Sequence, residues 1–276
     1  YIGGLITNQD EFKQKGRRLL VRELKEQVLN DGMHYERSPM YHLIILERLL
    51  DALNFAMGIG DDLKSVLKSY AARMTGLAIN WKDLDRIPMM QDSAYDIALS
   101  VSGIIEYSKR LLEQDYPSKP NYLTDSGYRR LDSENFTLFA NVGSINPSYQ
   151  PGHAHADELN FELFFEGKPI IVDKGVSTYE KNERRLFERS TSSHNCVVSG
   201  SNSSDVWSGF RVGRRASVKI GVDDDQILTA EHSGYGTITS RTFNSTVKDQ
   251  MTITDELIYQ SNSKGYYGKG YLHFHP

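Results

Sequence analysis

The chain of 276 residues is long enough for two ordinary domains, and its 39% apolar and 25% charged residues are typical of a globular protein. A formal net charge of −4 argues against a nucleic-acid partner held by bulk charge, and no run of about 18 apolar residues is present to span a membrane. The single Cys196 excludes an internal disulfide, which fits the cytosol or a periplasmic protein that does without disulfides.

Residues 1–116 have helical periodicity. The chain begins at Tyr1 in what reads as the middle of an element, so we interpret it as a fragment that lacks its N-terminus. Ser38 followed by Pro39 is typical of an N-cap and first turn, which predicts Tyr41 in the first turn of a helix. Successive helices with short loops favour an α-hairpin array or toroid. The apolar spacing predicts helices over 10–30, 38–57, 61–80 and, as one or two helices, 93–114.

The pattern changes at residues 117–121, a proline-containing stretch that we interpret as a linker. Beyond it, short apolar runs alternate with Gly, Asn, Asp and Ser turns, which favours a large antiparallel β-sandwich over 122–276. Asp223 to Asp225 are predicted to form a hairpin turn, because no calcium-loop spacing surrounds them. Strands are expected at 128–131, 136–140, 159–166, 169–173, 195–199, 210–222, 226–232, 237–243, 247–259 and 271–275.

Three histidines and an aspartate lie beside these strands. His153 and His155 are two residues apart, so in an extended segment both side chains point to the same face. Asp173 ends an apolar strand, and His194 follows a Ser/Thr cluster. Imidazoles and one carboxylate can bind a divalent cation such as zinc, but ordinary hydrogen bonds and a turn cap explain the same residues, and from spacing alone both interpretations stay open.

Tyrosines and arginines form the second group of candidates. Tyr41 and Tyr179 are each either a proton donor or acceptor, or a half-buried aromatic anchor. Arginines cluster at 184–189 and 211–215, where they form either a groove for an anionic polymer or salt bridges with Glu183, Glu188 and Asp205. Trp207 and Phe210 either stack on sugars or belong to the core.

These residues resemble the heparinase II/III-like polysaccharide lyases, which include heparan-sulfate lyases and oligo-alginate lyases. The resemblance covers nearly the whole chain and is most specific from 150 to 215. It is carried by Gly152-His153-Ala154-His155-Ala156-Asp157, Asp173 with Gly175 and Tyr179, Arg189-Ser190-Thr191 with His194-Asn195, Trp207-Ser208-Gly209-Phe210, and Asp31-Gly32 with Glu36, Ser38-Pro39 and Tyr41-His42.

The resemblance implies an α+β multidomain chain: the C-terminal part of an (α/α) toroid at 1–116, then an antiparallel β-sandwich at 122–276. It implies that Tyr41 is the catalytic tyrosine and that His153 reaches the substrate carboxylate and is a second candidate base. His155, Asp173 and His194 correspond to the ligands of a metal, usually zinc, in a supporting role. Tyr179, Arg189, Glu36 and His42 are implied to contact the substrate.

The implied reaction is β-elimination on a uronic-acid-containing anionic glycan, giving a 4,5-unsaturated product. Removal of the C5 proton builds negative charge on the carboxylate, which must be stabilised. The family's asparagine that neutralises this carboxylate has no counterpart in the 276 residues, because Asn8 lacks the right surroundings. The Asp157-Glu158 pair also departs from the family pattern, in which a small residue follows the aspartate.

Two further interpretations stay open: a biosynthesis-associated editing protein for an acidic surface polysaccharide, and a non-catalytic binding protein that keeps the cleft and the metal. The expected partner is an anionic polysaccharide or oligosaccharide rather than nucleic acid, and a homo-oligomer is left open. A periplasmic or secreted bacterial location is expected, with the cytoplasm as the alternative.

Overall fold

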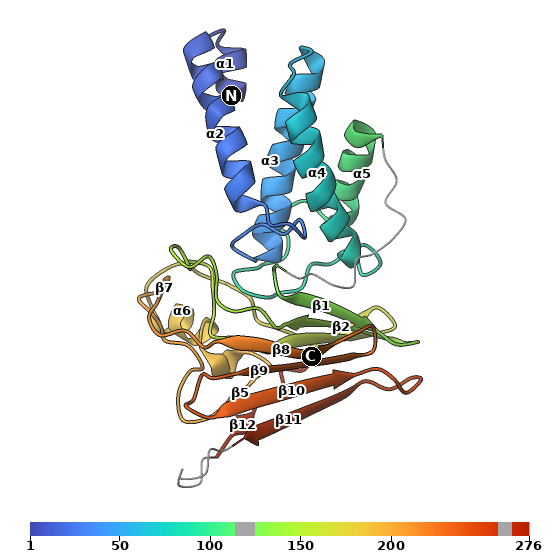
Figure 1. Cartoon of the computed structure of the whole chain (residues 1–276), viewed down its shortest axis with the longest axis vertical. Coiled ribbons are helices and arrows are strands. Elements are labelled where there is room, and N and C mark those ends of the chain that lie inside the picture. The colour runs from blue at the N-terminus through green and yellow to red at the C-terminus, as the bar shows by residue number, and fades with distance from the viewer. Residues whose placement is uncertain (114–124, 259–266, 276) are drawn as a thin grey trace. The chain divides into compact units, whose positions relative to one another are not determined.

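The computed structural model describes residues 1–113, 125–258 and 267–275. Helices come first along the chain and antiparallel strands second (Figure 1). Two compact units divide the chain: a helical unit of Tyr1–Ile87 and Asp96–Pro120, and a sheet unit of Pro88–Tyr95 and Asn121–Pro276. The predicted linker at 117–121 lies outside the described residues. None of the described helices combines the length and apolar character that a bilayer crossing requires.

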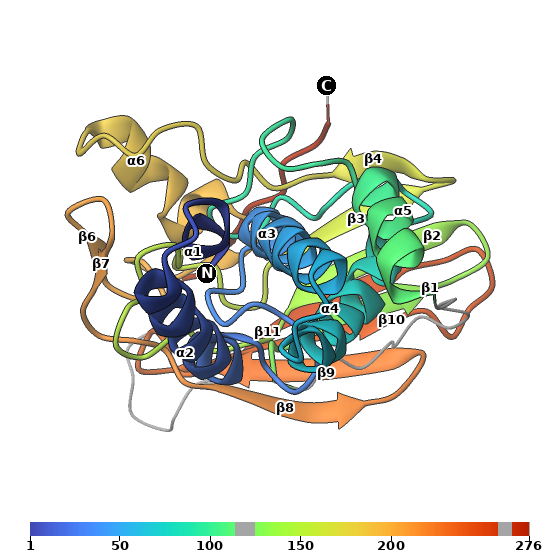
Figure 2. The same cartoon turned by 90° about the horizontal axis from the view of Figure 1, so that it is seen from above.

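In the helical unit, α3 contributes more buried apolar residues to the core than any other described helix. Its helix begins as predicted, because the Ser38 hydroxyl accepts a hydrogen bond from the Tyr41 N–H at 3.2 Å and Pro39 fills the first turn. Leucines along α3 are buried, and α4 and α5 pack beside it (Figure 2). The helices are α1 (Ile2–Ile6), α2 (Asp10–Gln27), α3 (Pro39–Gly58), α4 (Lys64–Ala78), a 3₁₀ turn (Ile79–Trp81) and α5 (Val101–Leu112).

The helix predicted over 93–114 is wrong in its first part. The Ser100 hydroxyl caps α5 by accepting the Gly103 N–H at 3.1 Å, so the helix starts at Val101. The preceding segment 88–95 is non-helical and belongs to the sheet unit, where the Asp92 N–H donates to the His153 carbonyl at 3.2 Å. These long-range bonds outweigh the local helical pattern.

Two four-stranded antiparallel sheets form the body of the sheet unit. Their strand orders are β1-β2-β3-β4 and β11-β10-β9-β8, and β5 with β12 and β6 with β7 form two short ribbons. The strands are β1 (Tyr128–Asp132), β2 (Phe136–Asn141), β3 (Phe161–Phe165), β4 (Lys168–Ile171), β5 (Val197–Val198), β6 (Val206–Trp207), β7 (Arg211–Val212), β8 (Val218–Asp223), β9 (Ile227–His232), β10 (Ile238–Asn244), β11 (Thr252–Ile258) and β12 (Lys269–Gly270).

One apolar core joins the two larger sheets. Phe161 of β3 and Phe243 of β10 are fully buried and meet edge to face, with ring centroids 5.7 Å apart. The Asp223–Asp225 turn is confirmed, because Asp224 Oδ1 accepts the Ile227 N–H at 2.6 Å between β8 and β9. The strand predicted over 210–222 is interrupted into β7 and β8, and the sequence pattern did not reveal the short helix α6 (Glu183–Glu188).

Replacement of Phe161 by Ala tests the shared core. Phe161→Ala removes a fully buried ring and is expected to lower the free energy of unfolding by about 3–5 kcal/mol. Phe165→Ala is the matched control on the same strand: its ring is 38% exposed and contacts Phe136, so a loss of about 1 kcal/mol or less is expected. Urea unfolding measures both, and equal losses would contradict the shared core.

Candidate functional site

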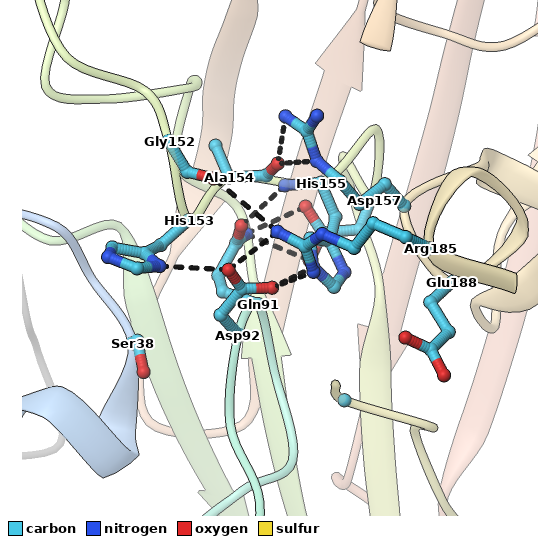
Figure 3. A network of polar contacts seen from close by, with 12 residues as sticks. Ser38, Gln91, Asp92, Gly152, His153, Ala154, His155, Asp157, Arg185 and Glu188 are labelled. Carbon is cyan, nitrogen blue, oxygen red and sulfur yellow. Dashed lines mark hydrogen bonds and ion pairs between the residues drawn. The ribbon is translucent and has the colours of Figure 1, made fainter. Parts of the chain in front are cut away.

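A buried carboxylate, Asp92, lies at the centre of the site (Figure 3). Its Oδ2 accepts from His153 Nδ1 at 2.8 Å, and its Oδ1 accepts from His155 Nε2 at 2.8 Å. The Arg185 guanidinium donates to both oxygens, at 2.7 Å to Oδ2. Burial alone would raise the pKa of Asp92, but the hydrogen bonds from these three side chains outweigh it and hold the pKa well below its usual value.

Asp92 also fixes the orientation of His153. Because Nδ1 donates to the carboxylate, a neutral His153 carries its lone pair on Nε2, on the opposite side of the ring. The side chain is 25% exposed, and the edge of the Tyr179 ring lies against it, with centroids 6.0 Å apart. His153 is therefore a partly exposed imidazole with a fixed tautomer, which suits proton transfer or contact with an anion.

Two neighbours hold the loop around His155. The Gln91 side chain accepts the His155 N–H at 2.7 Å and donates to the Asp157 carboxylate at 2.8 and 2.9 Å. On the other side, Arg189 donates to the Ala154 carbonyl at 3.0 and 2.8 Å and is fully buried. Arg189 has no exposed surface to offer a substrate, so a supporting role for this loop replaces its predicted contact.

His155 and His194, two of the three metal ligands that the resemblance implies, lie close together. Their ring centroids lie 5.1 Å apart, and both side chains are fully buried. His155 donates from Nε2 to Asp92, and His194 donates from Nδ1 to Asp173 Oδ2 at 2.7 Å. Among the described residues, the remaining nitrogens, His155 Nδ1 and His194 Nε2, have no hydrogen-bond partner. Metal-binding histidines commonly donate their other nitrogen to a carboxylate in this way.

The charge around these two nitrogens is negative. Burial, with Asp173 and Glu158 nearby, raises the pKa of Asp157 to about 7, and His194 opposes that shift. Burial opposes the charged form of His194, yet Asp173 outweighs it and raises the pKa of His194. Glu158, which departs from the family pattern, is buried and accepts from the hydroxyls of Ser203 and Ser204. A cation in place of the His194 proton would suit this field.

Asp173 contacts one of these histidines directly. Its second oxygen, Oδ1, accepts the Gly175 N–H at 2.9 Å. In the described part of the chain, no group of three or more His, Cys, Asp or Glu side chains is gathered closely enough to hold a metal. His155 and His194 could thus supply two ligands, with Asp173 orienting the second.

The three predicted residues of the helical unit lie around the start of α3. Tyr41 is in its first turn and partly exposed. Glu36 Oε2 lies 3.9 Å from His34 Nδ1. His42 is fully buried: its Nδ1 accepts the His34 N–H at 3.3 Å, and its Nε2 lies 3.0 Å from the Met74 carbonyl. Burial lowers the pKa of His42 to about 4, so an uncharged structural role replaces its predicted contact with substrate.

The sequence analysis missed Asp92, Gln91 and Arg185. The first two lie in a stretch with helical spacing. Arg185 lies in an arginine cluster for which two interpretations were open, a groove for an anionic polymer or salt bridges at the surface. For two members of those clusters the salt bridges are confirmed, because Arg184 pairs with Glu188 and Arg214 with Asp205. The pair Gln91-Asp92, three residues after Pro88, was the available signal, but nothing in the local sequence distinguishes it from a helix start.

A cavity of about 590 Å³ opens beside His153 within the sheet unit. Its lining includes the exposed side chains of Tyr179, Trp207 and Phe210, so the predicted substrate contact of Tyr179 remains available.

Family models match both parts of the chain. The model of the heparinase II/III N-terminus covers residues 6–120, and that of the heparinase II/III-like C-terminal region covers residues 116–276. The chain belongs to the heparinase II/III family.

Curated relatives of this heparinase II/III-family chain are bacterial. The heparin-sulfate lyase of Pedobacter heparinus is 25% identical over 222 residues, which are 70% of this chain and 33% of that protein. The heparin-sulfate lyase of Bacteroides stercoris is 23% identical over 219 residues, 68% of this chain and 31% of the relative. The chain thus spans about a third of the length of the curated relatives it matches.

Solved structures of the family share the fold. A crystal structure of heparinase III matches with a TM-score of 0.70 at 16% identity, over 91% of this chain and 44% of the other. A mutant of the heparan sulfate lyase HepC from Pedobacter heparinus matches with a TM-score of 0.66 at 19% identity, over 91% and 42%.

Removal of Asp92 tests the centre of the site. Asp92→Ala leaves the Arg185 charge buried without its anion, so we expect a loss of about 3–5 kcal/mol in the free energy of unfolding. The double variant Asp92→Ala/Arg185→Met should lose clearly less than the sum of the two single variants. Asp225→Ala, an exposed control, should change stability by about 0.5 kcal/mol or less. Additive losses in urea unfolding would refute the coupling.

Proposed function

We propose that this chain belongs to a polysaccharide lyase that cleaves a uronic-acid-containing anionic glycan by β-elimination. One observation carries the proposal: His153, held by buried Asp92, borders a cavity that also contains Tyr179 and two arginines. Membership of a family whose relatives are named heparin-sulfate lyases supports it. The protein would thus be a carbon–oxygen lyase that acts on polysaccharides.

The reaction follows from these side chains. A base removes the C5 proton of the uronate, the electrons of the C5–H bond form the C4=C5 double bond, and the C4–O bond breaks. In this proposal Tyr41 gives its phenolic proton to the leaving oxygen. His153 Nε2, or Tyr41 itself, takes the C5 proton according to the stereochemistry of the uronate. Because Asp92 accepts from Nδ1 of His153, Nε2 is the nitrogen that would take the proton in a neutral imidazole.

A divalent cation, zinc by its ligand chemistry, is part of the proposal. His155 Nδ1 and His194 Nε2 would hold it, and Asp173 would orient His194. When bound, it would supply a fixed anchor for the loop next to His153 rather than take part in the elimination.

We extend the proposal to the architecture. The helices would form the C-terminal part of an (α/α) toroid at 1–116, and the two sheets, which share one core, a β-sandwich at 122–276. A periplasmic or secreted location and an anionic polysaccharide partner complete this assignment.

Tyr41→Phe removes the proposed proton donor and keeps the ring. We expect kcat to fall by about 10²–10⁴-fold, because general acid–base catalysis contributes about that much. Tyr70→Phe removes a hydroxyl elsewhere in the helical unit and should leave kcat unchanged. The absorbance of the unsaturated product measures the rate. Full activity of Tyr41→Phe would contradict the mechanism. Binding of uronate oligomers by the wild-type protein without formation of product would favour the non-catalytic alternative.

The metal is tested by analysis of the purified protein. We expect about one divalent ion per chain, lost in His155→Ala and in His194→Ala because each removes a nitrogen ligand. His275→Ala removes an exposed histidine and should keep the ion. Metal content by mass spectrometry and the melting temperature with and without a chelator are the readouts. A metal-free wild-type protein with an unchanged melting temperature would overturn this assignment.

A further inference from the structure

The cavity beside His153 belongs entirely to the sheet unit and carries a local excess of positive charge. None of the described residues that line it is acidic, although the chain as a whole has a net charge of −4. Its volume of about 590 Å³ is within the usual range of ligand sites. The lining residues are Tyr149, Gln150, Pro151, Gly152, His153, Tyr179, Trp207, Phe210, Arg211, Val212 and Arg215.

Four exposed aromatic rings gather at this cavity. Tyr149, Tyr179, Trp207 and Phe210 are 63%, 49%, 52% and 44% exposed. Exposed apolar surface concentrated at one place marks a binding site rather than a solvent-facing surface. Flat aromatic faces suit the apolar faces of sugar rings, while the polar edges of both remain in water.

The arginines of the two sequence clusters divide into two groups. Arg184, Arg185 and Arg214 are paired with the carboxylates of Glu188, Asp92 and Asp205, and buried Arg189 donates to backbone carbonyls. Within the described residues, Arg211 and Arg215 have no carboxylate partner. Arg215 donates one hydrogen bond, at 2.7 Å to the Ser148 carbonyl, and Arg211 donates none to the described residues.

The hairpin that carries Arg211 is held by strand pairing and by the buried Arg185 side chain. Trp207 of β6 pairs with Arg211 of β7, and the Arg211 guanidinium lies 5.5 Å from the centre of the Trp207 ring. The turn between the two strands is anchored because the Gly209 carbonyl accepts from Arg185 Nε at 2.7 Å. Stacking on Trp207 and this anchor preorganise the guanidinium for a planar anion.

We propose that this cavity is a subsite for the sugar next to the reacting uronate, and that Arg211 and Arg215 recognise a sulfate or carboxylate group on that sugar. The inference rests on the proposed lyase function for the position of the uronate at His153. Arginine binds both anions through two parallel hydrogen bonds, so either group satisfies the site. The protein would then prefer glycans in which the sugar adjacent to the uronate is itself charged.

Three substrates distinguish the sources of that charge. Heparan sulfate carries sulfated glucosamine next to the uronate, polymannuronate carries a carboxylate on every sugar, and heparosan carries neutral N-acetylglucosamine. We expect Arg211→Gln and Arg215→Gln each to raise KM about tenfold on a charged substrate, with KM on heparosan changed by less than about twofold. Rates are compared at low, constant ionic strength, because salt screens exposed charges.

Matched variants separate this effect from a general loss of charge or fold. Lys219→Gln removes one positive charge on β8 outside the cavity and should keep the KM of the wild type on all three substrates. Arg211→Lys keeps the charge but not the planar fork and should give an intermediate KM. Far-ultraviolet circular dichroism checks that each variant is folded.

Binding without turnover gives an independent readout. The chain has two tryptophans, and Trp81 is 2% exposed, so a change of fluorescence on addition of oligosaccharide reports Trp207. A larger KM effect on heparan sulfate assigns the anion as sulfate, and a larger effect on polymannuronate assigns it as carboxylate.

The outcomes separate this inference from the lyase function. Cleavage by both arginine variants with the substrate preference of the wild type would overturn the subsite and leave the lyase intact. If the wild-type protein makes no unsaturated product, the lyase proposal fails, and the fluorescence titration still decides the subsite. Weaker binding of charged oligosaccharides by Arg211→Gln would then support the subsite. Equal binding of heparosan and heparan sulfate by the wild-type protein would overturn the subsite.

Discussion

The site in the sheet unit depends on one buried carboxylate, Asp92, to which three side chains donate hydrogen bonds. Asp92 accepts from two imidazoles and a guanidinium, so its charge is neutralised where water cannot reach it. This arrangement requires segment 88–95 to lie against the loop after Asp173. Gly175 allows that approach, because a Cβ at this position would lie 2.1 Å from the Ser93 carbonyl. The backbone contact and the carboxylate therefore constrain each other.

The two histidines that share Asp92 differ because of burial rather than chemistry. His153 and His155 bond to different oxygens of the same group, yet the first is 25% exposed and the second is fully buried. A partly exposed imidazole with a fixed tautomer can contact a ligand from solution. A fully buried imidazole can contact only groups in the interior of the unit. The proposed division into a histidine that faces the substrate and a histidine that holds a metal therefore rests on this difference in exposure.

Sequence reasoning found the parts of the fold and the site that depend on local patterns. The Ser38-Pro39 cap and the hairpin turn after β8 follow from residue types close in sequence. It failed where long-range bonds decide. Segment 88–95 has helical spacing but is part of the sheet unit, and Arg189 is fully buried although Arg184 of the same cluster is exposed. No local signal separates these cases.

Whether an arginine is already paired with a carboxylate decides whether it can recognise a ligand. A guanidinium that is already bonded to a carboxylate cannot also bind an anionic ligand at full strength, so the number of arginines in a sequence overstates the capacity for anions. Arg185 uses its charge to hold Asp92 and its Nε to hold the Gly209 turn, and that turn presents Arg211 beside Trp207. Arg185, which is paired with Asp92, therefore positions Arg211, which has no carboxylate partner among the described residues. In the proposed subsite, specificity for a charged sugar would depend on the buried contacts of Arg185 that position Arg211. It would not depend on the net surface charge of the protein.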